Sequence, residues 1–304
     1  MLESPFSAAQ LRESVIAVPP LARDSSGQVC EHENGNIIRF LEAGDVRSLL
    51  YGGNAVFYHI RMSEYANTLS ILARTAGDET VVIPSIGPTH GFAMDQIDVL
   101  NDFSFPTVML LPSRDVVDQQ GIARSARILA ERLGAPIVLY IKFDRWIDPG
   151  LVESLERDGV ISWIKYAVVR DNPSQDDYLR EILDAFPAQR VVSGIGEQPA
   201  IIHLRDFGVT GFTSGCVCVA PDISMQMMRA IHSGQYDRAE LIRSWFSPLE
   251  DLRNDINPIR VLHHAVEQAN IAKTGSISPM LSDLDAETIQ TIRDAVQGML
   301  RLKP

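Results

Sequence analysis

Lys165 stands in the middle of a stretch, ISWIKYA at 161–167, whose other residues are typical of a buried strand. Ammonium groups are strongly hydrated, and lysine is rarely buried without a partner. An apolar site would lower the pKa of the amine, because desolvation disfavours its charged form. A neutral amine can attack a ketone and form a Schiff base, which makes the adjacent carbon acidic. The alternative without chemistry is a lysine paired with a carboxylate or reaching the rim of the fold.

The chain contains four lysines, so few residues could share this role. Lys142 also ends a predicted strand, but it lies beyond the apolar part of that strand. There we expect a rim position and a partner such as Asp144, and Lys165 is therefore favoured. Tyr140, one strand earlier, is either a packing residue with one hydrogen bond or a phenol that moves protons beside an imine.

Small residues close three of the predicted strands and leave backbone N–H groups accessible. Glycine lets the backbone approach a ligand closely, and N–H groups at such turns suit a carboxylate. The alternative is a set of tight turns that need positive φ. The candidate binding residues are Gly52, Gly53, Asn54, Ser193, Gly194 and Thr213.

These residues belong to a regular alternation of short apolar stretches and amphipathic helices. Strands are predicted at 14–20, 48–55, 80–87, 107–114, 136–142, 161–167, 190–196 and 211–216. Such alternation requires parallel pairing with right-handed crossovers. Eight units over about 200 residues favour the α/β class and a closed (β/α)8 TIM barrel. An open doubly wound sheet is the alternative, but the GxGxxG turn expected there does not follow the first strand.

The predicted helices have recognisable ends. The stretch 121–134 repeats apolar residues at three- and four-residue spacing and stops at Gly134. The stretch 63–77 offers Ser63 as its N-cap and Gly77 as its stop. Pro149 stands in the first turn of a third helix, where its missing N–H costs nothing.

From Pro221 onward the sequence predicts helices and no further strand. We therefore divide the chain into a barrel, 1–220, and a C-terminal helical extension, 221–304. Alternate residues of a barrel strand point to the axis, and chemistry lies at the carboxyl ends of the strands. We expect Trp163, Lys165 and Ala167 to face inward, because the layer between strands and helices is dry and almost never holds a lysine.

Composition limits the partners. The formal charge of −12 argues against nucleic-acid binding, for which a basic surface is expected. No apolar run approaches the roughly 18 to 20 residues that cross a bilayer, and the polar, acidic start does not read as a secretory signal. Three cysteines suit a reducing compartment, and Cys216 and Cys218 lack further ligands for zinc. We expect a soluble cytoplasmic protein.

With these motifs in place, the sequence resembles the dihydrodipicolinate synthase and N-acetylneuraminate lyase family of class I aldolases. The resemblance runs from about Ser14 to the C-terminus. It rests on the glycine-rich turn after the second strand, an arginine five residues after "LY", and the motifs "IKYA", "VSGIGE", "GFTSG" and "INPIRVLHHA".

The resemblance implies roles for individual residues. Lys165 matches the Schiff-base lysine and Tyr140 the proton-transferring phenol, while Arg145 matches an arginine near the active-site entrance. The turn Gly52, Gly53 and Asn54 matches the one that holds the carboxylate of a 2-oxo acid, and Gly194 and Thr213 match positions that line the same pocket. The family is usually a tetramer, a dimer of dimers, and uses no metal or organic cofactor.

Two departures bear on the substrate. The family turn commonly carries hydroxyl residues followed by Gly-Glu, whereas this chain has Gly53, Asn54, Ala55 and Val56, so two hydroxyls that bind carboxylate and relay protons are missing. The synthase proper also has a tyrosine pair after its fourth strand, where this chain reads LLPSRDVVD. Both differences argue against dihydrodipicolinate synthesis.

The leading hypothesis is a Schiff-base lyase, aldolase or dehydratase, that acts on pyruvate or a 2-keto-3-deoxy sugar acid. A homotetramer or homodimer is expected, with no cofactor. The alternatives are a catalytically silent relative that binds a 2-oxo acid, the synthase proper, and a barrel enzyme of unrelated chemistry such as a phosphosugar isomerase. The last would need a phosphate site after the final two strands and a mobile glutamate base, and no such glutamate is evident.

Overall fold

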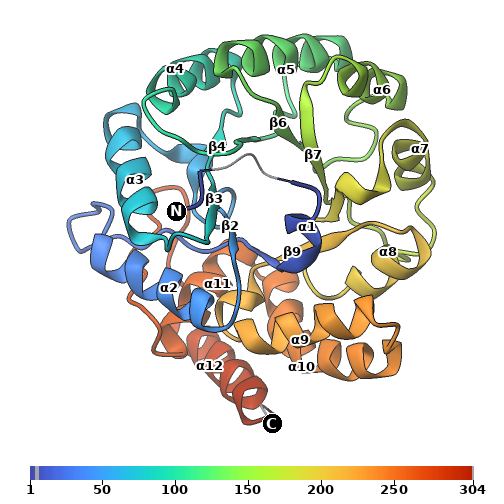
Figure 1. Cartoon of the computed structure of the whole chain (residues 1–304). Coiled ribbons are helices and arrows are strands. Elements are labelled where there is room, and N and C mark those ends of the chain that lie inside the picture. Colours follow the sequence, from blue (N-terminus) through green and yellow to red (C-terminus); the bar gives the residue numbers. More distant parts are fainter. Residues whose placement is uncertain (4–6, 303–304) are drawn as a thin grey trace.

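The computed structural model describes residues 1–3 and 7–302. Its parallel strands form a ring with helices around the outside (Figure 1), and hydrogen-bonded neighbours follow the order β3-β2-β1-β9-β8-β7-β6-β5-β4. The strands are β1 (Ile16–Ala17), β2 (Ser48–Leu50), β3 (Val81–Ile83), β4 (Ser85–Ile86), β5 (Met109–Leu110), β6 (Ile137–Ile141), β7 (Ile161–Tyr166), β8 (Val191–Ser193) and β9 (Gly211–Ser214).

The two ends of this order, β3 and β4, are parts of one extended segment that is interrupted at Pro84. Proline has no N–H to donate to a neighbouring strand, but its carbonyl still accepts from Met109 N at 2.9 Å. The segment therefore joins both sides of the sheet and closes the ring. All eight predicted stretches contain a strand, and the predicted TIM barrel is confirmed.

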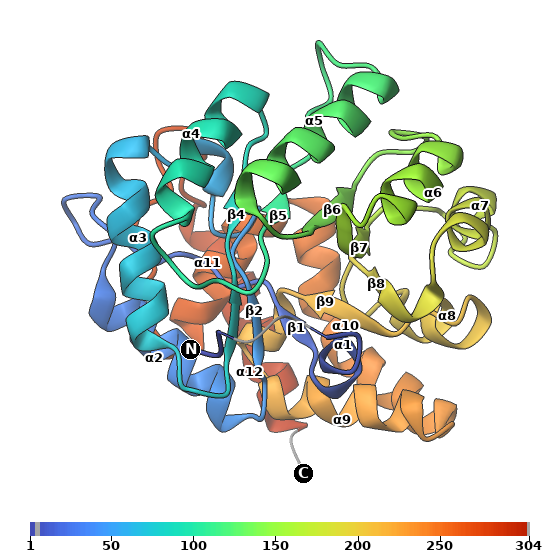
Figure 2. The ribbon, with the colours of Figure 1, turned by 45° about the horizontal axis from the view of Figure 1, so that its top comes forward.

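Helices connect the strands and cover the barrel (Figure 2). They are α1 (Gln10–Glu13), α2 (Glu31–Ala43), α3 (Met62–Thr75), α4 (His90–Leu100), α5 (Gln119–Leu133), α6 (Pro149–Arg157), α7 (Asp177–Ala185) and α8 (Ala200–Asp206), with 3-10 turns η1 (Phe57–His59), η2 (Ala188–Arg190) and η3 (Cys216–Cys218). None of the helices that the structure describes is long and apolar enough to traverse a bilayer.

Of the four predicted helix ends, the two at Gly134 and Pro149 are confirmed, the start at Ser63 is wrong, and α3 ends at Thr75, with Ala76 as its C-cap directly before the predicted Gly77. Helix α5 ends before Gly134, which takes a left-handed φ of 70°, and α6 has Pro149 in its first turn. Helix α3 does not start from Ser63: Arg61 is its N-cap, and the Glu64 carboxylate accepts from Arg61 N at 3.2 Å. That side chain satisfies a free N–H of the first turn, so the helix begins earlier.

The C-terminal part consists of α9 (Pro221–His232), α10 (Tyr236–Asp255), α11 (Pro258–Gln268) and α12 (Ala286–Arg301). Figure 1 shows these helices gathered on one side of the ring, next to β9. Helix α9 also contacts the barrel, since Val15 N donates to Met225 Sδ at 3.3 Å. The division between residues 220 and 221 stays a prediction.

Strand register sets the level of each inward side chain. Tyr140 of β6 pairs with Lys165 of β7, which pairs with Val192 of β8. Trp163 lies two residues below Lys165 and is 1 % exposed. The amine therefore rises from an apolar floor toward the carboxyl ends of the strands, where barrel enzymes place their chemistry.

Candidate active site

Lys165 is buried in the structure without a counter-ion. Its side chain is 5 % exposed, and Nζ lies 4.6 Å from the centre of the Tyr140 ring. Among the described residues, no carboxylate oxygen lies within 4.0 Å of Nζ. The predicted inward orientation is met, and the alternative of a lysine clamped by an acid is excluded for this part of the chain.

Burial lowers the pKa of Lys165 to about 7, and the charges of Lys142 and Arg253 act in the same direction. A substantial fraction of the amine is then neutral at physiological pH, whereas an exposed lysine is almost wholly protonated. Burial also raises the pKa of the neighbouring Tyr140 phenol, which stays protonated and able to donate. The pair thus offers a nucleophile and an acid side by side.

Gly194 makes room for the lysine stem. A Cβ at this position would lie 2.9 Å from Lys165 Cγ and 2.8 Å from the Tyr166 carbonyl oxygen. Its own N–H donates to that carbonyl at 2.6 Å, so it is already used within the sheet. Gly194 therefore contributes space beside the amine, and any larger residue would push Lys165 out of place.

The turn after β2 presents unused donors. Within the described part of the chain, the backbone N–H groups of Gly53, Asn54 and Ala55 donate no hydrogen bond, whereas Val56 N closes the turn on the Gly53 carbonyl at 2.9 Å. Val56 has a positive φ of 56°. Successive free N–H groups in such a turn form a concave site for an anion. Gly52 lies against Met109. If Gly52 had a Cβ, that atom would lie 2.8 Å from Met109 Cε, so a larger residue does not fit without a shift.

Asn54 is fixed from two sides. Its side-chain amide donates to the Val18 carbonyl at 2.7 Å, and its own carbonyl accepts from His263 Nε2 of α11 at 2.9 Å. Because a carbonyl only accepts, the His263 proton is on Nε2. One of the two side-chain N–H donors of Asn54 is used by Val18, directly after β1, so the free backbone N–H groups of the turn are the larger donor set. His263 belongs to the INPIRVLHHA motif, and its hydrogen bond to the Asn54 carbonyl ties this motif to the turn after β2.

Ser193 and Thr213 point to opposite sides of the barrel wall. The Ser193 hydroxyl lies 2.8 Å from His203 Nδ1 of α8, outside the ring, so its side chain is not brought to Lys165. Strand alternation places Thr213 inward, two residues above Gly211, and it is 2 % exposed. No hydrogen bond of the Thr213 hydroxyl occurs among the described residues, which leaves it available to a ligand.

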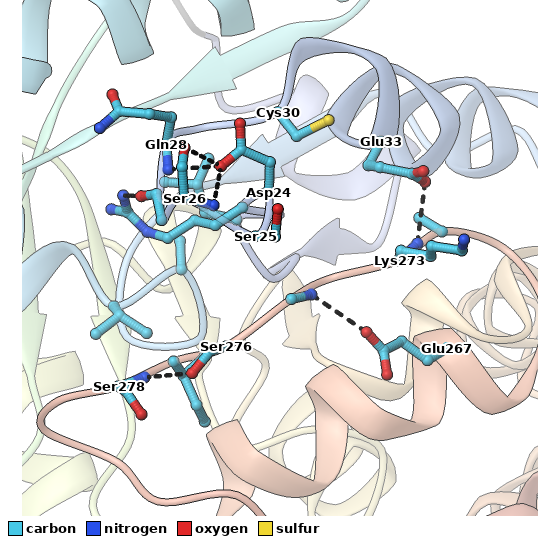
Figure 3. Close-up of a pocket in the computed structure, with 18 of the residues that line it drawn as sticks. Asp24, Ser25, Ser26, Gln28, Cys30, Glu33, Glu267, Lys273, Ser276 and Ser278 are labelled. Carbon is cyan, nitrogen blue, oxygen red and sulfur yellow. Dashed lines mark hydrogen bonds between the residues drawn. The ribbon is translucent and has the colours of Figure 1, made fainter.

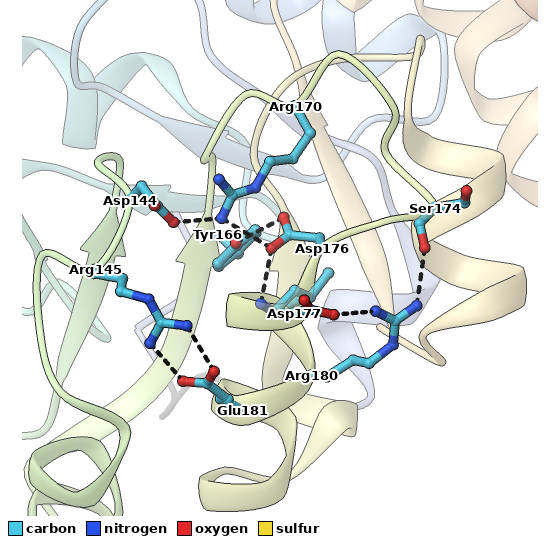
Figure 4. A network of polar contacts seen from close by, with 10 residues as sticks. Asp144, Arg145, Tyr166, Arg170, Ser174, Asp176, Asp177, Arg180 and Glu181 are labelled. Atoms are coloured by element: carbon cyan, nitrogen blue, oxygen red, sulfur yellow. Dashed lines mark hydrogen bonds and ion pairs between the residues drawn. The ribbon is translucent and has the colours of Figure 1, made fainter.

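Arg145 is turned away from the amine. Its guanidinium makes two bonds of 2.7 Å to Glu181 on α7, as Figure 4 shows. The expected pairing of Lys142 with Asp144 is also wrong, because Asp144 pairs with Arg170. Arg170 in turn contacts the buried Asp176 at 3.1 Å. Ion pairs thus tie the loops after β6 and β7 to α7, and neither arginine is free to bind substrate at the mouth.

Lys142 lies at the predicted rim position, but without Asp144 as its partner. Its Nζ lies 5.8 Å from the centre of the Tyr58 ring and 5.9 Å from that of Phe143. Tyr58 was missed: it follows the glycine turn, and burial together with the nearby Tyr140 raises its pKa. Strand alternation is consistent with this place for Lys142, because it stands two residues after the inward Tyr140.

A cavity of about 1200 Å³ lies beside the turn after β2, where Ala55 and Val56 line it, and does not include Lys165 (Figure 3). Loops after β1 and β2 and the segment after α11 line it. Two of its charged groups pair with each other, since Arg23 bonds Glu64 at 2.9 and 3.0 Å, and the Glu267 carboxylate accepts from the backbone N–H of Thr274 at 2.8 Å. The free Cys30 and the exposed Lys273 also line this cavity, but neither is a buried amine like Lys165.

A second set of buried charges lies outside the barrel wall, between β8, β9 and the C-terminal helices. The Glu197 carboxylate accepts from the hydroxyls of Ser214 and Ser224, both at 2.8 Å, and Glu197 N donates to Glu250 at 2.8 Å. Burial raises the pKa of both glutamates. Donor atoms of Glu197, Glu250 and Cys216 lie within 4.8 Å of one another, but hydroxyls already occupy both Glu197 oxygens. The cluster fits proton sharing better than a metal.

Comparison with known structures identifies the architecture. A dihydrodipicolinate synthase from Oceanobacillus iheyensis superimposes with a TM-score of 0.85 at 19% identity, over 97% of this chain and 98% of the other. The chain has the dihydrodipicolinate synthase fold. The sialic acid aldolase of Ruminococcus gnavus shares it, with a TM-score of 0.84 at 13% identity over 95% and 97% of the two chains. A catalytic lysine mutant of that aldolase matches equally well, with a TM-score of 0.84.

Sequence comparison finds relatives that match a smaller part of the chain. A probable 5-dehydro-4-deoxyglucarate dehydratase from Streptomyces avermitilis is 22% identical over 228 residues, which are 72% of this chain and 71% of the relative. A protein of the same description from Streptomyces griseus is 23% identical over 226 residues, 70% and 68% of the two chains. No model of a known protein family matches the chain. The resemblance read from the motifs is therefore confirmed at the level of the fold.

Proposed function

We propose that this protein is a lyase that forms a Schiff base between Lys165 and a 2-oxo acid, either pyruvate or a 2-keto-3-deoxy sugar acid. The observation that carries the proposal is the buried Lys165 amine, 5 % exposed, stacked on Tyr140 and without a carboxylate nearby among the described residues. Such an amine loses little solvation when it becomes neutral and attacks a ketone.

The reaction begins when neutral Lys165 Nζ adds to the keto carbon and the oxygen leaves as water. The resulting imine carries the proton that makes it an electron sink. A proton then leaves the adjacent carbon and an enamine forms, with Tyr140 as the group that moves the proton. Retro-aldol cleavage and loss of a hydroxyl both pass through this enamine, so aldolase and dehydratase chemistry need the same residues.

The substrate carboxylate is assigned to the turn after β2, where the N–H groups of Gly53, Asn54 and Ala55 are unused within the described chain. The inward Thr213 hydroxyl is a further donor. Gly52 and Gly194 allow the substrate to approach the backbone closely. Ser193 contributes to the site through its backbone only. In line with what the family resemblance implies, none of these steps calls on a metal or an organic cofactor.

The named relatives support the substrate class. The dehydratases act on 5-dehydro-4-deoxyglucarate, a keto-deoxy sugar acid, and the aldolase with its catalytic lysine cleaves a sialic acid. The stretch 112–118 lacks the tyrosine pair of the synthase proper, which argues against that activity.

Borohydride reduction in the presence of pyruvate tests the proposal. An imine at Lys165 should be reduced to a stable adduct, which intact-mass and peptide mass spectrometry would place at this residue. Lys165→Met should abolish the adduct, while Lys273→Met, which removes an exposed lysine, should not. An unmodified Lys165 under saturating pyruvate would refute the mechanism.

A binding protein without turnover is the second candidate, and the turn favours it. Asn54, Ala55 and Val56 replace the hydroxyls that relay protons in the family. Adduct formation with pyruvate, but no product from a panel of keto-deoxy sugar acids, would support this candidate over the lyase.

We further propose that the protein works in the cytoplasm as a homodimer or homotetramer. Its three cysteines are free, which suits a reducing compartment. The side chains of Val116 and Val117, on the loop after β5, are 104 % and 44 % exposed. A second copy of the chain would cover these apolar side chains at an interface. Sedimentation of the full chain would decide the assembly.

A further inference from the structure

We propose that His263 of α11 is a positioning residue for the substrate carboxylate. Its hydrogen bond to the Asn54 carbonyl sets the direction in which the turn after β2 presents a free N–H group. Helix α11 belongs to the C-terminal part of the chain, so a helix outside the barrel strands would help to shape the active site. This role rests on the function proposed above and names a residue that decides how tightly the 2-oxo acid is held.

The hydrogen bond joins two buried residues that lie 209 positions apart in the sequence. The His263 ring Nε2 lies 2.9 Å from the Asn54 carbonyl oxygen, and the two residues are 3 % and 8 % exposed. Nδ1 of the same ring makes no hydrogen bond among the described residues. Within that part of the chain, the turn after β2 is therefore the single hydrogen-bond partner of this side chain.

The carbonyl that His263 holds belongs to the same peptide unit as the Ala55 N–H. In a trans peptide the C=O and the N–H point in opposite directions, and the bond between Asn54 and Ala55 is not among the cis bonds of the described chain. With its carbonyl held toward α11, this peptide turns the Ala55 N–H away from that helix. The N–H donates no hydrogen bond among the described residues, and neither do those of Gly53 and Asn54. It is thereby kept among the free donors that can meet an anion.

The backbone of the turn does not fix this peptide by itself. Val56 N donates to the Gly53 carbonyl at 2.9 Å and closes a four-residue turn, in which the peptide between Asn54 and Ala55 is the central one. Turns of types I and II share this closing bond and differ in the direction of the central peptide. In the reversed direction, a carboxylate would meet the Asn54 carbonyl oxygen in place of the Ala55 N–H. The bond from His263 opposes that reversal.

The side chain of Asn54 is held to the strands at the same time. Its amide donates to the Val18 carbonyl at 2.7 Å, and Val18 N donates to the Ser214 carbonyl of β9 at 2.8 Å. One contact thus fixes the side chain to the barrel, and the other fixes the main-chain carbonyl to α11. Donors that are fixed before the ligand arrives need no ordering on binding, and this raises affinity.

His263 acts without adding a charge to the site. Burial lowers its pKa to about 4, so the ring is neutral at neutral pH. A donor to the carbonyl also strengthens the N–H of the same peptide, because successive hydrogen bonds polarise one another. The contact therefore improves both the direction and the strength of the Ala55 donor, while the histidine itself stays away from the substrate.

The test compares pyruvate with pyruvamide, which has the same shape and an activated ketone but no charge. The measured quantity is the concentration of each compound that gives half-maximal borohydride trapping at Lys165. In the parent protein, pyruvamide should need a concentration about 10- to 100-fold higher, the range expected for charge-assisted contacts. The reactivity of each free ketone is the same for every variant, so a change in this ratio reports on the carboxylate contact.

His263→Leu removes the donor and should lower the ratio about 10-fold, because pyruvate then needs a higher concentration and pyruvamide does not. His263→Gln places an amide donor near the position of Nε2 and should restore most of the ratio. His264→Leu is the matched control: this histidine stands on the same helix, faces Glu267 at 3.9 Å, and should leave the ratio unchanged. Both concentrations refer to the folded protein, so a loss of stability in a variant affects them equally.

The outcomes separate this role from the proposed function. If the parent protein traps no pyruvate at Lys165, the Schiff-base function itself fails. If pyruvate is trapped but the ratio stays at its parent value in His263→Leu, the positioning role is refuted and the lyase proposal stands. The same conclusion follows if His263→Gln loses as much of the ratio as His263→Leu, because the hydrogen bond is then not what matters.

Discussion

Two regions of this protein bury ionisable side chains, and the two regions differ in how those side chains are hydrogen-bonded. At the barrel mouth, Lys165 is buried beside an aromatic ring with no acid in contact among the described residues. Behind the barrel wall, Glu197 and Glu250 are equally buried, but two serine hydroxyls and a backbone N–H bond them. The first site leaves its amine without a partner. The second bonds both oxygens of Glu197 and one oxygen of Glu250, and among the described residues it leaves only Glu250 Oε2 without a hydrogen bond.

The difference separates reactivity from structure. A buried group with full hydrogen bonding stabilises the fold, since its removal would leave several partners unsatisfied. A buried group without a partner costs stability and gains a shifted pKa, which is the condition for nucleophilic chemistry at neutral pH. We therefore expect changes at Lys165 to affect activity and changes at Glu197 to affect folding.

The sharpest test of this contrast is Lys165→Met, which keeps an apolar stem of similar length. The turnover number should fall by at least about 10³-fold, because the covalent intermediate cannot form. The same variant should be more stable by about 3 kcal/mol at pH 8, because an amine with a depressed pKa no longer has to lose its proton on folding. Steady-state kinetics and urea unfolding measure both effects. A variant that is inactive because it is less stable than the parent would contradict the contrast.

Glu197→Ala should give the opposite result. It leaves the hydroxyls of Ser214 and Ser224 without their acceptor in a buried site, and we expect a loss of about 3 kcal/mol in the free energy of unfolding. Glu181→Ala, which removes an exposed carboxylate from Arg145, is the matched control and should leave the urea midpoint nearly unchanged. Adduct formation at Lys165 should survive in the folded fraction. Equal urea midpoints for the two variants would rule out a structural role for the cluster.

Tyr140→Phe removes the phenol hydroxyl at the barrel mouth and keeps the aromatic ring beside Lys165. The ring that supports Lys165 stays, but the phenol that moves the proton is lost, so turnover should fall about 10²-fold. Borohydride trapping with pyruvate should persist. If trapping and turnover disappear together, Tyr140 acts by holding the lysine and not by moving a proton.

The pH dependence gives the smallest and most specific contrast. Since the pKa of Lys165 is about 7, kcat/KM should rise tenfold per pH unit below 7 and level off above it.

The contributions of the two regions to the free energy of unfolding should change with pH in opposite directions. The folded state binds fewer protons than the unfolded state at Lys165 between pH 7 and 10.5, so stability rises with pH there and Lys165→Met flattens the rise. Burial raises the pKa of Glu250 above its ordinary value of 4.5. The contribution of Glu250 to the free energy of unfolding is therefore fully present below pH 4.5 and is lost as the pH increases. Glu250→Gln should flatten this decrease of stability with pH. Parallel slopes in the parent and both variants would contradict the assignment.

Alternation along single strands made much of this site predictable. Tyr140 and Lys165 were placed inward on sequence alone, and the register pairs them directly. The eight strands were found because apolar runs, glycines and helical spacing recur locally. The break at Pro84 was not foreseen, although a proline inside a strand is a warning of irregularity.

What failed were pairings between distant segments. Arg145 meets Glu181, which lies 36 residues away, and Glu197 meets Glu250 across 53 residues. Ser193 was read as a ligand because it precedes a glycine, yet its hydroxyl meets His203 on the other side of the wall. No local pattern encodes such partners.

The sequence by itself determined the barrel, the inward lysine and its tyrosine, because period-two and helical patterns are properties of neighbouring residues. Only the tertiary structure decided which charges are compensated. A pKa or a free donor depends on every group packed around it, and those groups come from strands, loops and helices far apart in the chain. The same folding that gives Glu197 its serines leaves Lys165 and Lys142 without acids, and the proposed chemistry follows from that difference.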